Sequence, residues 1–342
     1  DVGWVAVQGP LWTSGGERGL YKTTNGGTSW KRVLGNDQWT GVTDIMIDPR
    51  NPQILYAATW DRHRTVAALM GGGPGTALYR SDDGGENWTK LTEGLPESNM
   101  GKIGITISPQ NPDVVYAAIE LDRKSGAVYR SSNRGASWTK MSDTVSGGTG
   151  PHYYQELYAS PHEFDRLYLM NVRVLTSGDG GKTFVQLKER DKHSDNHAIV
   201  FKKDDPNYIM LGTDAGIYET FDNAETWRYI KNLPLTQFYK VAVNNAEPFY
   251  HIFGGTQDNG SAGGPSATDE REGIANKHWY KTLFADGHQS ATDPVYNDII
   301  YAETQQGGLY RIDLTTGEQV SVQPKAGLGE SHERFNWDAP IL

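Results

Sequence analysis

The sequence contains no cysteine, which excludes disulfides, thiolate metal ligands and cysteine nucleophiles together. It has no apolar run of the roughly 18 residues that a membrane-spanning helix requires. Basic side chains are also scarce, with 32 lysines and arginines against 42 aspartates and glutamates and a net charge of −10. Nucleic-acid backbones and anionic membranes favour a positive surface, so we expect neither nucleic-acid binding nor membrane insertion.

Glycine and aromatic residues are abundant instead, with 40 glycines, 18 tyrosines and 10 tryptophans among 342 residues. Glycine-rich turns between aromatic and β-branched segments are typical of an all-β protein with many short strands. The chain begins at Asp1, without a methionine or a signal sequence. We therefore expect it to be a processed or partial piece of a longer product.

An eight-residue motif, which we call the octet, recurs at intervals of 43–58 residues. Its copies are TTNGGTSW (23–30), SDDGGENW (81–88), SSNRGASW (131–138), SGDGGKTF (177–184) and TFDNAETW (220–227). Asp or Asn at the third position can accept hydrogen bonds from backbone N–H groups of the turn, and glycine at the fifth supplies a positive φ. Ala224 replaces that glycine in the fifth copy, so we expect a more strained turn there.

A second motif alternates with the octet and contains a Pro/Asn turn followed by an apolar run, as in DPRNPQILYAATW (48–60) and SPQNPDVVYAAIE (108–120). Each repeat then divides into four strands, A to D, with the octet as the turn between C and D. Four-stranded units of about 40–50 residues are typical of β-propeller blades. We predict an all-β propeller with about seven blades represented, part of a larger multi-bladed protein.

The repeats place the whole chain, 1–342, in a single propeller region. They divide it into a partial first blade at 1–36, blades at about 37–95, 96–143, 144–190, 191–233, 234–284 and 285–325, and a lone strand at 334–342. Two arrangements fit the incomplete ends. Either the last strand completes the first blade and closes a ring, or the natural chain continues with further blades at both ends.

Longer strings carry a resemblance to known proteins. The octet resembles the Asp-box of BNR-repeat proteins, which include sialidases, xyloglucanase-type glycoside hydrolases and the sortilin domain. The strings GLYKTTNGGTSW, DPRNPQILYAATW, GGTQDNGS and RFNWDAPIL resemble a group of large bacterial exported proteins described as sortilin-like (VPS10-like) or glycosyl-hydrolase-like. The resemblance covers essentially the whole chain and implies a secreted or periplasmic location and further blades. In such folds the octet lies away from the ligand, so we expect a structural role for all its copies.

Antiparallel strands alternate in direction, so the D-to-A and B-to-C connections of every blade emerge on one face and the octets on the other. We call the first of these the connector face. The connectors that it collects are 36–39, 60–75, 120–126, 150–155, 191–197, 213–216, 233–237, 256–260, 285–289, 304–308 and 332–336. Because the A strands surround the central channel, we expect the polar connector residues to line its mouth.

A concave, polar and acidic channel mouth with aromatic neighbours is the usual ligand site of this architecture. We predict a peptide or glycan ligand there, bound by His193, His197, Gln257, Asn259, His288, Gln289, Gln305, Trp60 and Arg62, with Trp39 also on the rim. In the alternative interpretation these groups only cap strand ends and bind water.

Glycoside hydrolysis is the alternative function, and it requires two carboxylates roughly 5–9.5 Å apart. The candidate catalytic residues are Asp195, Asp214, Asp258 and Asp286. A carboxyl group beside others in a partly dry site can have its pKa raised enough to act as an acid. The sequence does not select a pair, and each aspartate could equally hold its own turn through backbone hydrogen bonds.

His193, Asp195 and His197 alternate along an extended segment, which would place all three on one side. Two imidazoles and a carboxylate suit a divalent metal, but the spacing is generic, so we interpret the segment as mouth lining and predict no metal and no cofactor. The apolar insertion 64–79 carries glycines at 71–73, which would let it move as a lid or dock on a partner domain. Packing on an adjacent blade is the alternative.

Other hydrolytic chemistries lack their motifs: the sequence has no Arg-Ile-Pro segment of the sialidase kind, no G-x-S-x-G elbow and no phosphate-binding loop. The sequence therefore predicts an exported, sortilin-like module that binds a ligand or scaffolds an assembly through its connector face. A xyloglucanase-like hydrolase is the alternative. The hydrolase requires a correctly spaced carboxylate pair in an open cleft, whereas the binding module does not.

Overall fold

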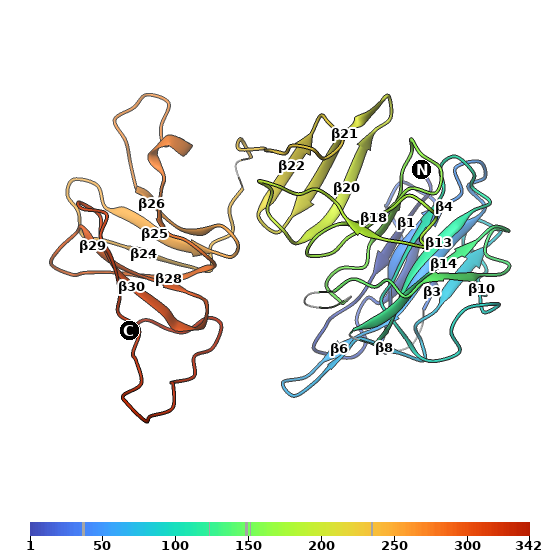
Figure 1. Cartoon of the computed structure of the whole chain (residues 1–342), viewed down its shortest axis with the longest axis horizontal. Coiled ribbons are helices and arrows are strands. Elements are labelled where there is room, and N and C mark those ends of the chain that lie inside the picture. The colour runs from blue at the N-terminus through green and yellow to red at the C-terminus, as the bar shows by residue number, and fades with distance from the viewer. Residues whose placement is uncertain (36–37, 123, 148–149, 151, 234) are drawn as a thin grey trace. The chain divides into compact units, whose positions relative to one another are not determined.

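The computed structural model describes residues 1–35, 38–122, 124–147, 150, 152–233 and 235–342. The predicted connectors at 36–39, 120–126, 150–155 and 233–237 each include a position outside these ranges, so only their other residues are described. The described elements are β-strands and two short 3-10 helices, η1 (Asn276–His278) and η2 (Gln305–Gly307) (Figure 1). The chain divides into two compact units, Asp1–Ile230 (unit 1) and Lys231–Leu342 (unit 2).

Unit 1 is built from antiparallel sheets in which each strand is hydrogen-bonded to the next one along the chain, apart from the insertion between β5 and β9. Sheet 1 has three strands, β1 (Gly3–Val7), β2 (Gly19–Thr23) and β3 (Lys31–Leu34). Four-stranded sheets follow: sheet 2 with β4 (Thr40–Ile47), β5 (Leu55–Asp61), β9 (Leu78–Ser81) and β10 (Thr89–Lys90); sheet 3 with β12 (Ile103–Ile107), β13 (Val115–Asp122), β14 (Ser125–Ser131) and β15 (Thr139–Ser142); sheet 4 with β16 (Leu157–Ala159), β17 (Leu167–Leu169), β18 (Leu175–Ser177) and β19 (Val185–Gln186); and sheet 5 with β20 (Asn196–Lys202), β21 (Asp205–Thr213), β22 (Gly216–Thr220) and β23 (Arg228–Tyr229). Consecutive four-stranded meanders of this kind are propeller blades, so the predicted fold class is confirmed.

Unit 2 contains two further four-stranded sheets. Sheet 6 has β24 (Lys240–Val243), β25 (His251–Thr256), β26 (Gly260–Pro265) and β27 (Tyr280–Leu283), and sheet 7 has β28 (Gly287–Thr292), β29 (Ile299–Thr304), β30 (Gly308–Asp313) and β31 (Gln319–Ser321). Residues 334–342 pair with no strand among the described residues, and the lone strand expected there stays a prediction. Their main chain pairs with the side chains of Glu303 and Gln289 instead of a neighbouring strand. The number of blades in one ring stays a prediction.

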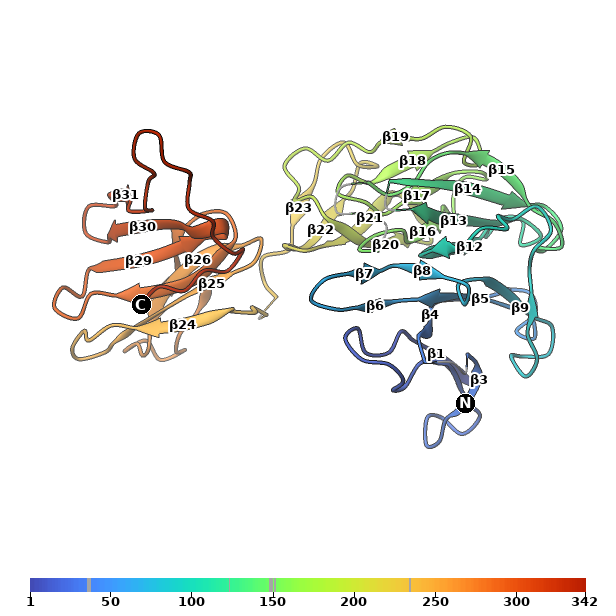
Figure 2. The same cartoon turned by 90° about the horizontal axis from the view of Figure 1, so that it is seen from below.

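Successive sheets lie side by side within each unit. In unit 1, β4 lies beside β1 and β12, and β12 beside β16 (Figure 2). A strand that is covered on both faces has a continuous apolar sequence. Residues 115–119 of β13 form such a run, and all of them are buried. Tyr56 reaches across from one sheet to the next and donates its hydroxyl to the carbonyl of Arg134 at 3.0 Å. This packing buries the sheet faces and leaves the connecting loops to carry exposed polar groups.

The octets form the turns between the last two strands of sheets 1 to 5, as predicted. In every copy the third-position side chain accepts the backbone N–H of the seventh residue, at 2.9–3.0 Å. The first-position hydroxyl accepts the N–H of the fifth residue, at 2.8–3.1 Å. Hydrogen bonds from Thr183 lower the pKa of Asp179 to about 2, and those from Thr226 do the same for Asp222. Each octet therefore closes its turn with its own side chains, while the backbone N–H of its fourth residue donates to a carbonyl earlier in the same repeat, at 2.9 Å.

The fifth octet residue lies in the left-handed region of every copy. Its φ is +80° to +91° where it is glycine and +71° at Ala224. A side chain in this conformation costs roughly 1–2 kcal/mol, because its Cβ atom approaches the following carbonyl oxygen. The strain expected at Ala224 is thus present in the backbone.

Candidate functional site

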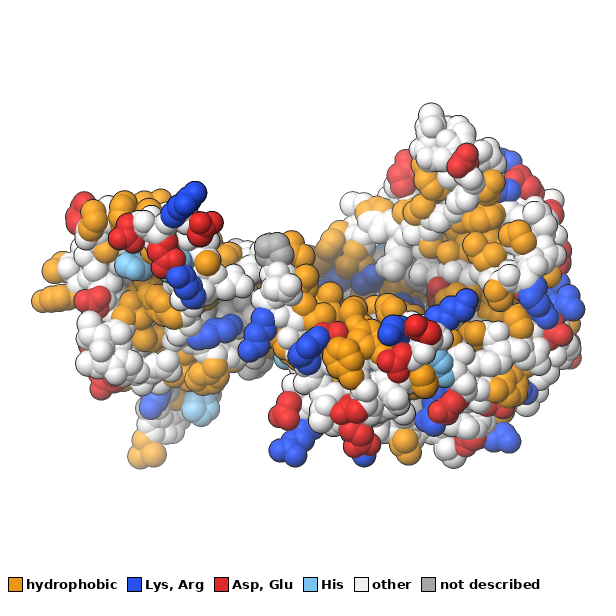
Figure 3. All heavy atoms as spheres, turned by 90° about the horizontal axis from the view of Figure 1, so that it is seen from above, with side chains coloured by type: hydrophobic (Ala, Val, Ile, Leu, Met, Phe, Trp, Pro, Cys, Tyr) orange, Lys and Arg blue, Asp and Glu red, His pale blue; other side chains and the backbone are white. Residues whose placement is uncertain are grey.

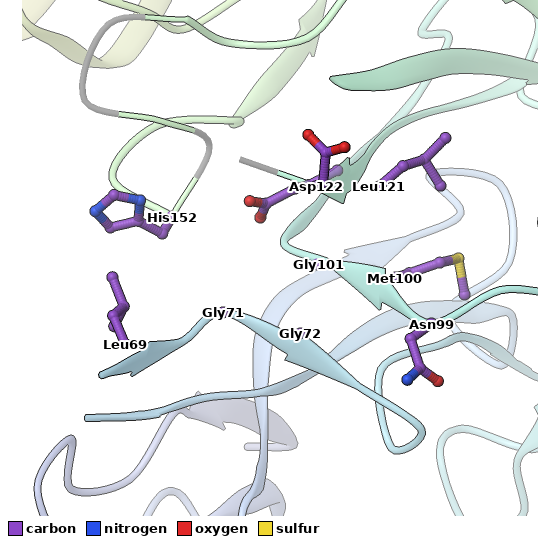
Figure 4. Close-up of a pocket in the computed structure, with 10 residues that line it drawn as sticks. Leu69, Gly71, Gly72, Asn99, Met100, Gly101, Leu121, Asp122 and His152 are labelled. Atoms are coloured by element: carbon purple, nitrogen blue, oxygen red, sulfur yellow. The ribbon is translucent and has the colours of Figure 1, made fainter. Parts of the chain in front are cut away.

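A cavity of about 400 Å³ lies where connectors of sheets 2, 3 and 4 meet in unit 1. The residues that line it are Leu69, Gly71, Gly72, Asn99, Met100, Gly101, Glu120, Leu121, Asp122 and His152. Figure 4 shows Leu69 and His152 on one side of the cavity and Asn99 and Met100 on the other. In the space-filling view the surface of unit 1 is hollowed, and hydrophobic and charged side chains both line the hollow (Figure 3).

The connector 60–75, which contains most of the insertion 64–79, forms one wall of this cavity because it pairs with the chain just before sheet 3. Its strands β6 (His63–Arg64) and β7 (Leu69–Met70) make a hairpin, and β8 (Gly72–Gly73) pairs with β11 (Met100–Gly101). A Cβ atom at Gly72 would lie 2.5 Å from the carbonyl oxygen of Met100, and one at Gly73 would overlap the carboxylate of Asp61. These glycines permit a close approach of backbones, so residues 72–73 pack against residues 100–101, whereas Val66 in the hairpin loop is fully exposed. Movement of the insertion as a lid stays a prediction.

The carboxyl groups of Glu120 and Asp122 line the same cavity in opposite electrostatic environments. Glu120 is 6% exposed, and burial raises its pKa to about 7, although its Oε2 atom accepts the backbone N–H of Lys102 at 2.9 Å. Asp122 is exposed, and hydrogen bonds from Lys124 and Ser125, whose backbone nitrogens lie at 2.8 Å, lower its pKa. One carboxyl group therefore keeps its proton close to neutral pH while the other is ionised, which allows separate acid and base roles.

Lys102 connects the cavity to a buried polar network. Its Nζ atom lies 2.6 Å from Oε1 of Glu156, and its side chain is 9% exposed. Asp44 on β4 accepts the backbone N–H of Ile105 at 3.0 Å, and desolvation raises its pKa to about 6. Asp44 is half-buried. Lys102 thus pairs with Glu156, and Asp44 lies close enough for the charges of both residues to affect its pKa.

Trp60 and Arg62 lie together, and Trp60 is buried whereas Arg62 is half-buried. Trp60 is 1% exposed and donates its indole N–H to the carbonyl of Gly71 at 2.9 Å. This differs from the expectation of a ligand-binding Trp60 at the rim, because the insertion packs onto the indole. The guanidinium Cζ of Arg62 lies 4.7 Å from the centroid of the Trp60 ring. Trp39 packs against His63, with ring centroids 4.2 Å apart.

His197, Asp195 and Asp214 form a cluster with two tyrosines, which we call the tyrosine cluster (Tyr153, Tyr154, Asp195, His197 and Asp214). Nε2 of His197 lies 2.7 Å from Oδ1 of Asp214, and Tyr153 donates its hydroxyl to Oδ2 of that carboxylate at 3.0 Å. Tyr154 donates its hydroxyl to Asp195, and its ring stacks on His197 with centroids 5.4 Å apart. Donors of the chain itself thus occupy both carboxylates.

The segment 191–197 is held by a buried ion pair. Nζ of Lys192 lies 2.7 Å from Oε1 of Glu189, and the two side chains are 0% and 1% exposed. The side-chain amide of Asn196 donates to the same carboxylate at 3.0 Å. The residues that fix this connector are therefore Lys192, Glu189 and Asn196, which the sequence pattern does not single out.

His193, Asp195 and His197 are not arranged as three ligands of one metal ion. The φ of Asp195 is +63°, which breaks the strand alternation expected along this segment. His197 is paired with Asp214, and Nδ1 of His193 lies 2.8 Å from the carbonyl oxygen of Ser194. Over the ranges that the structure describes, no group of three His, Asp or Glu side chains is placed to hold a metal ion.

In unit 2, Asp258, Asp286 and Gln305 are joined by hydrogen bonds between connectors. The backbone N–H of Asp258 donates to Oδ1 of Asp286 at 3.0 Å, and the backbone N–H of Asp286 donates to Oε1 of Gln305 at 3.2 Å. Gln257 and Asn259 flank Asp258 and are exposed. The side chains of Asp286 and Gln305 therefore hold three neighbouring connectors together, which are 256–260, 285–289 and 304–308.

His288 and Gln289 contact a later segment of unit 2. His288 is buried, and its ring stacks on that of Tyr239 with centroids 4.9 Å apart. Gln289 pairs with the main chain of Ile341 through two hydrogen bonds, of 2.8 and 3.2 Å. Two of the residues predicted to bind ligand are therefore covered or occupied by the chain itself.

The structure brings predicted residues together within each unit. Asp195, His197 and Asp214 meet in unit 1, and Asp258, Asp286 and Gln305 meet in unit 2. Whether these sets share one channel mouth stays a prediction. The cavity residues Glu120, Asp122 and His152 are absent from the predicted set, although their connectors were assigned to the connector face. The only sequence signal that could have identified these three residues is their position in connectors of the connector face.

No helix in the described part of the chain is long and apolar enough to cross a membrane. No family model matches the chain. A curated relative, the oligoxyloglucan-reducing end-specific xyloglucanase of Emericella nidulans, is 23% identical over 222 residues, which are 60% of this chain and 26% of that protein. The chain thus spans about a quarter of the length of this curated relative.

Solved structures are similar at low sequence identity. PorZ, a surface component of the type-IX secretion system of Porphyromonas gingivalis, matches 92% of this chain and 38% of its own, with 13% identity and a TM-score of 0.49. An ancestral GH74 enzyme matches 93% of this chain and 45% of its own, with 15% identity and a TM-score of 0.47. In both cases the chain spans less than half of the solved protein.

Proposed function

We propose that this protein binds a glycan chain at the connector face of unit 1, with the cavity beside the insertion 60–75 as its central subsite. The composition of that cavity carries the proposal, because the carboxyl groups of Glu120 and Asp122 line it together with the apolar side chains of Leu69 and Met100. A sugar ring presents hydroxyl groups at its edge and C–H groups on its faces, so it needs both kinds of contact. The partial sequence similarity to a xyloglucanase supports a glycan rather than a peptide.

The polar groups of the cavity suit hydroxyl groups, which donate and accept at once. Asp122 is ionised at neutral pH, because its pKa is lowered, and it accepts hydrogen bonds from hydroxyl groups. Glu120 keeps its proton up to a pH of about 7 and can donate one. His152 also lines the cavity.

Calorimetric titration of the full chain with xyloglucan and β-glucan oligosaccharides tests the proposal. We expect saturable binding and a dissociation constant at least tenfold weaker in Asp122→Asn, which loses the ionic acceptor. Asp204→Asn is the matched control, because that side chain is 79% exposed and lies in the turn between β20 and β21. Unchanged affinity in Asp122→Asn, or no binding of any oligosaccharide, would refute the proposal.

Glycoside hydrolysis at the same cavity is a second candidate function. The specific observation that favours it is the opposite direction of the pKa shifts of Glu120 and Asp122. Glu120 would protonate the leaving oxygen, and Asp122 would act as base or nucleophile. The pair drawn from Asp195, Asp214, Asp258 and Asp286 remains the alternative arrangement, although chain donors engage Asp195 and Asp214.

Release of reducing ends from the same oligosaccharides separates these arrangements. We expect Glu120→Gln to lower turnover at least a thousandfold while oligosaccharide affinity stays within about threefold, because proton donation is lost and the shape is kept. Asp214→Asn and Asp258→Asn should retain turnover. Full turnover in Glu120→Gln would reject the cavity as the catalytic site, and loss of turnover in the aspartate variants would favour the alternative arrangement.

The exported, sortilin-like scaffold role that the sequence resemblance implies remains a separate proposal. A scaffold would bind a protein partner, and Asp122→Asn would leave that binding unchanged. Export itself would be tested by locating the full-length natural product in cell fractions.

A further inference from the structure

Segment 337–341 of unit 2 is bound in the manner of a peptide ligand at the connector end of sheet 7. Alternate residues of the segment make its main-chain hydrogen bonds. The carbonyl of Trp337 accepts the backbone N–H of Gln306 at 3.1 Å. The backbone N–H of Ala339 donates to Oε1 of Glu303 at 2.7 Å.

Gln289 recognises the main chain of Ile341 in both directions. Its Nε2 atom donates to the carbonyl of Ile341 at 2.8 Å, and its Oε1 atom accepts the N–H of the same residue at 3.2 Å. A side-chain amide that pairs in this way replaces the backbone of a partner strand. Such recognition holds an extended peptide and is independent of the ligand's own side chain at that position.

Asp338 supplies the contact that depends on side-chain identity. Nζ of Lys240 lies 3.1 Å from both of its carboxylate oxygens, and Nδ1 of His288 lies 3.7 Å from Oδ1. The next residue, Ala339, is 6% exposed, so the site closes around a small side chain. The site therefore matches an acidic residue followed by a small one.

Buried polar groups beneath the segment also point to a binding site. His288 and Glu303 are each 0% exposed. Both ring nitrogens of His288 and the Oε2 atom of Glu303 have no hydrogen-bond partner within the part of the chain that the structure describes. Buried groups without partners are rare in folded proteins, so each one calls for a bound water, ion or ligand or for a functional role. Burial also raises the pKa of Glu303.

We propose that the connector end of sheet 7 is a peptide-binding site for an extended segment with an acidic residue followed by a small one, and that 337–341 is its resident occupant. Glu303 and Gln289 hold this segment by its main chain through their side chains. A free peptide of the same class competes with the resident segment. This site lies in unit 2 and is independent of the glycan proposal for unit 1.

The test uses the full chain and a fluorescent peptide with the sequence FNWDAPIL, residues 335–342. A tethered segment competes at an effective concentration on the order of millimolar, so we expect weak binding to the unmodified chain. Ala339→Pro removes the N–H that Glu303 accepts and releases the segment, so peptide affinity should rise at least tenfold. Adding Gln289→Ala should reverse that gain, whereas adding Gln319→Ala, which removes a glutamine bonded to Thr282, should not.

Hydrogen exchange of the Ile341 amide, measured in the same variants, reports release of the resident segment. Protection should be present in the unmodified chain and lost in Ala339→Pro. A peptide with lysine in place of its aspartate should not bind any variant. The proposal is overturned if Ala339→Pro leaves the Ile341 amide protected, if the released site does not bind the peptide, or if Gln289→Ala leaves affinity unchanged.

Discussion

Nζ of Lys192 lies 2.7 Å from Oε1 of Glu189, and both side chains are withdrawn from solvent. The other oxygen of this carboxylate accepts the backbone N–H of Val174 at 3.0 Å, so the pair ties the connector before sheet 5 to sheet 4. Desolvation lowers the pKa of Lys192, although the neighbouring Glu189 opposes that shift. The pair thereby positions the connector that carries Asp195 and His197.

Lys192→Met should lower the free energy of unfolding of unit 1 by about 3–5 kcal/mol, because it leaves the charge of Glu189 buried and unpaired. Urea unfolding of the full chain measures the change. Arg190→Met is the control, because Arg190 pairs with Asp191 at 3.5 Å at the surface, with side-chain exposures of 89% and 81%. That change should cost less than about 1 kcal/mol. Adding Glu189→Gln to Lys192→Met should recover part of the loss, and equal costs for Lys192→Met and Arg190→Met would contradict this assignment.

Ala224→Gly should raise the free energy of unfolding by about 0.5–1 kcal/mol. Glycine removes the left-handed strain of roughly 1–2 kcal/mol. Part of this gain is offset, because glycine loses more conformational entropy on folding than alanine does. Ala198→Gly, in the exposed part of β20, is the matched control and should lower stability by about 0.5–1 kcal/mol. Thermal unfolding distinguishes the two, and a loss of stability in both variants would mean that the fifth octet carries no strain.

Gly72→Ala should open the wall of the cavity, because the new Cβ atom would lie 2.5 Å from the carbonyl of Met100. We expect a cost of about 1–3 kcal/mol and faster proteolysis within the hairpin 63–70. Gly71→Ala meets no atom within 4 Å and should change neither quantity. Equal proteolysis rates in the two variants would show that the pairing of β8 with β11 does not hold the insertion.

Glu120 makes stability depend on pH. Its pKa is about 7 in the folded chain against an ordinary value of 4.5, so the folded state binds this proton more tightly than the unfolded state. Its stabilising contribution is complete below pH 4.5 and is lost as the pH rises to about 7. The difference between the two pKa values corresponds to about 3 kcal/mol.

Glu120→Gln keeps an uncharged acceptor for the N–H of Lys102 and should lack this dependence. Urea unfolding at pH 4.5 and pH 8 measures it. At each pH the free energy of unfolding of Glu120→Gln is subtracted from that of the parent chain. This difference should fall by about 3 kcal/mol between pH 4.5 and pH 8. The raised pKa of Asp44 affects both chains alike. A difference between parent and variant that does not change with pH would show that Glu120 is not desolvated.

The local parts of this fold could be predicted from the sequence. The octet features depend only on contacts within one turn. They are the Asp or Asn at the third position, the glycine at the fifth and the backbone strain at Ala224, and the structure places them as expected. Residues 115–119 read as one apolar run, and they form a strand buried on both faces. In each case the cause lies within about ten residues of the pattern, so the pattern is sufficient.

The candidate site could not be predicted in the same way, because its properties arise from residues far apart in the chain. Glu120 follows an apolar run, but its raised pKa depends on burial that long-range packing of the connectors creates. Lys192 lies in a polar stretch, and only Glu189 and the packing of sheet 4 bury it. Trp60 was expected at the rim because it is an aromatic residue at a connector, but the insertion that follows it covers its ring. Long-range pairing therefore decided which polar residues face solvent.

The self-contained hydrogen bonding of the octet has an evolutionary consequence. The side-chain hydrogen bonds that close each octet turn lie within the octet, so duplication of the gene segment for one blade supplies this corner together with those bonds. Selection can then diversify the loops at the opposite end without disturbing that corner. A lineage can thus lengthen such a protein blade by blade while it acquires new specificities.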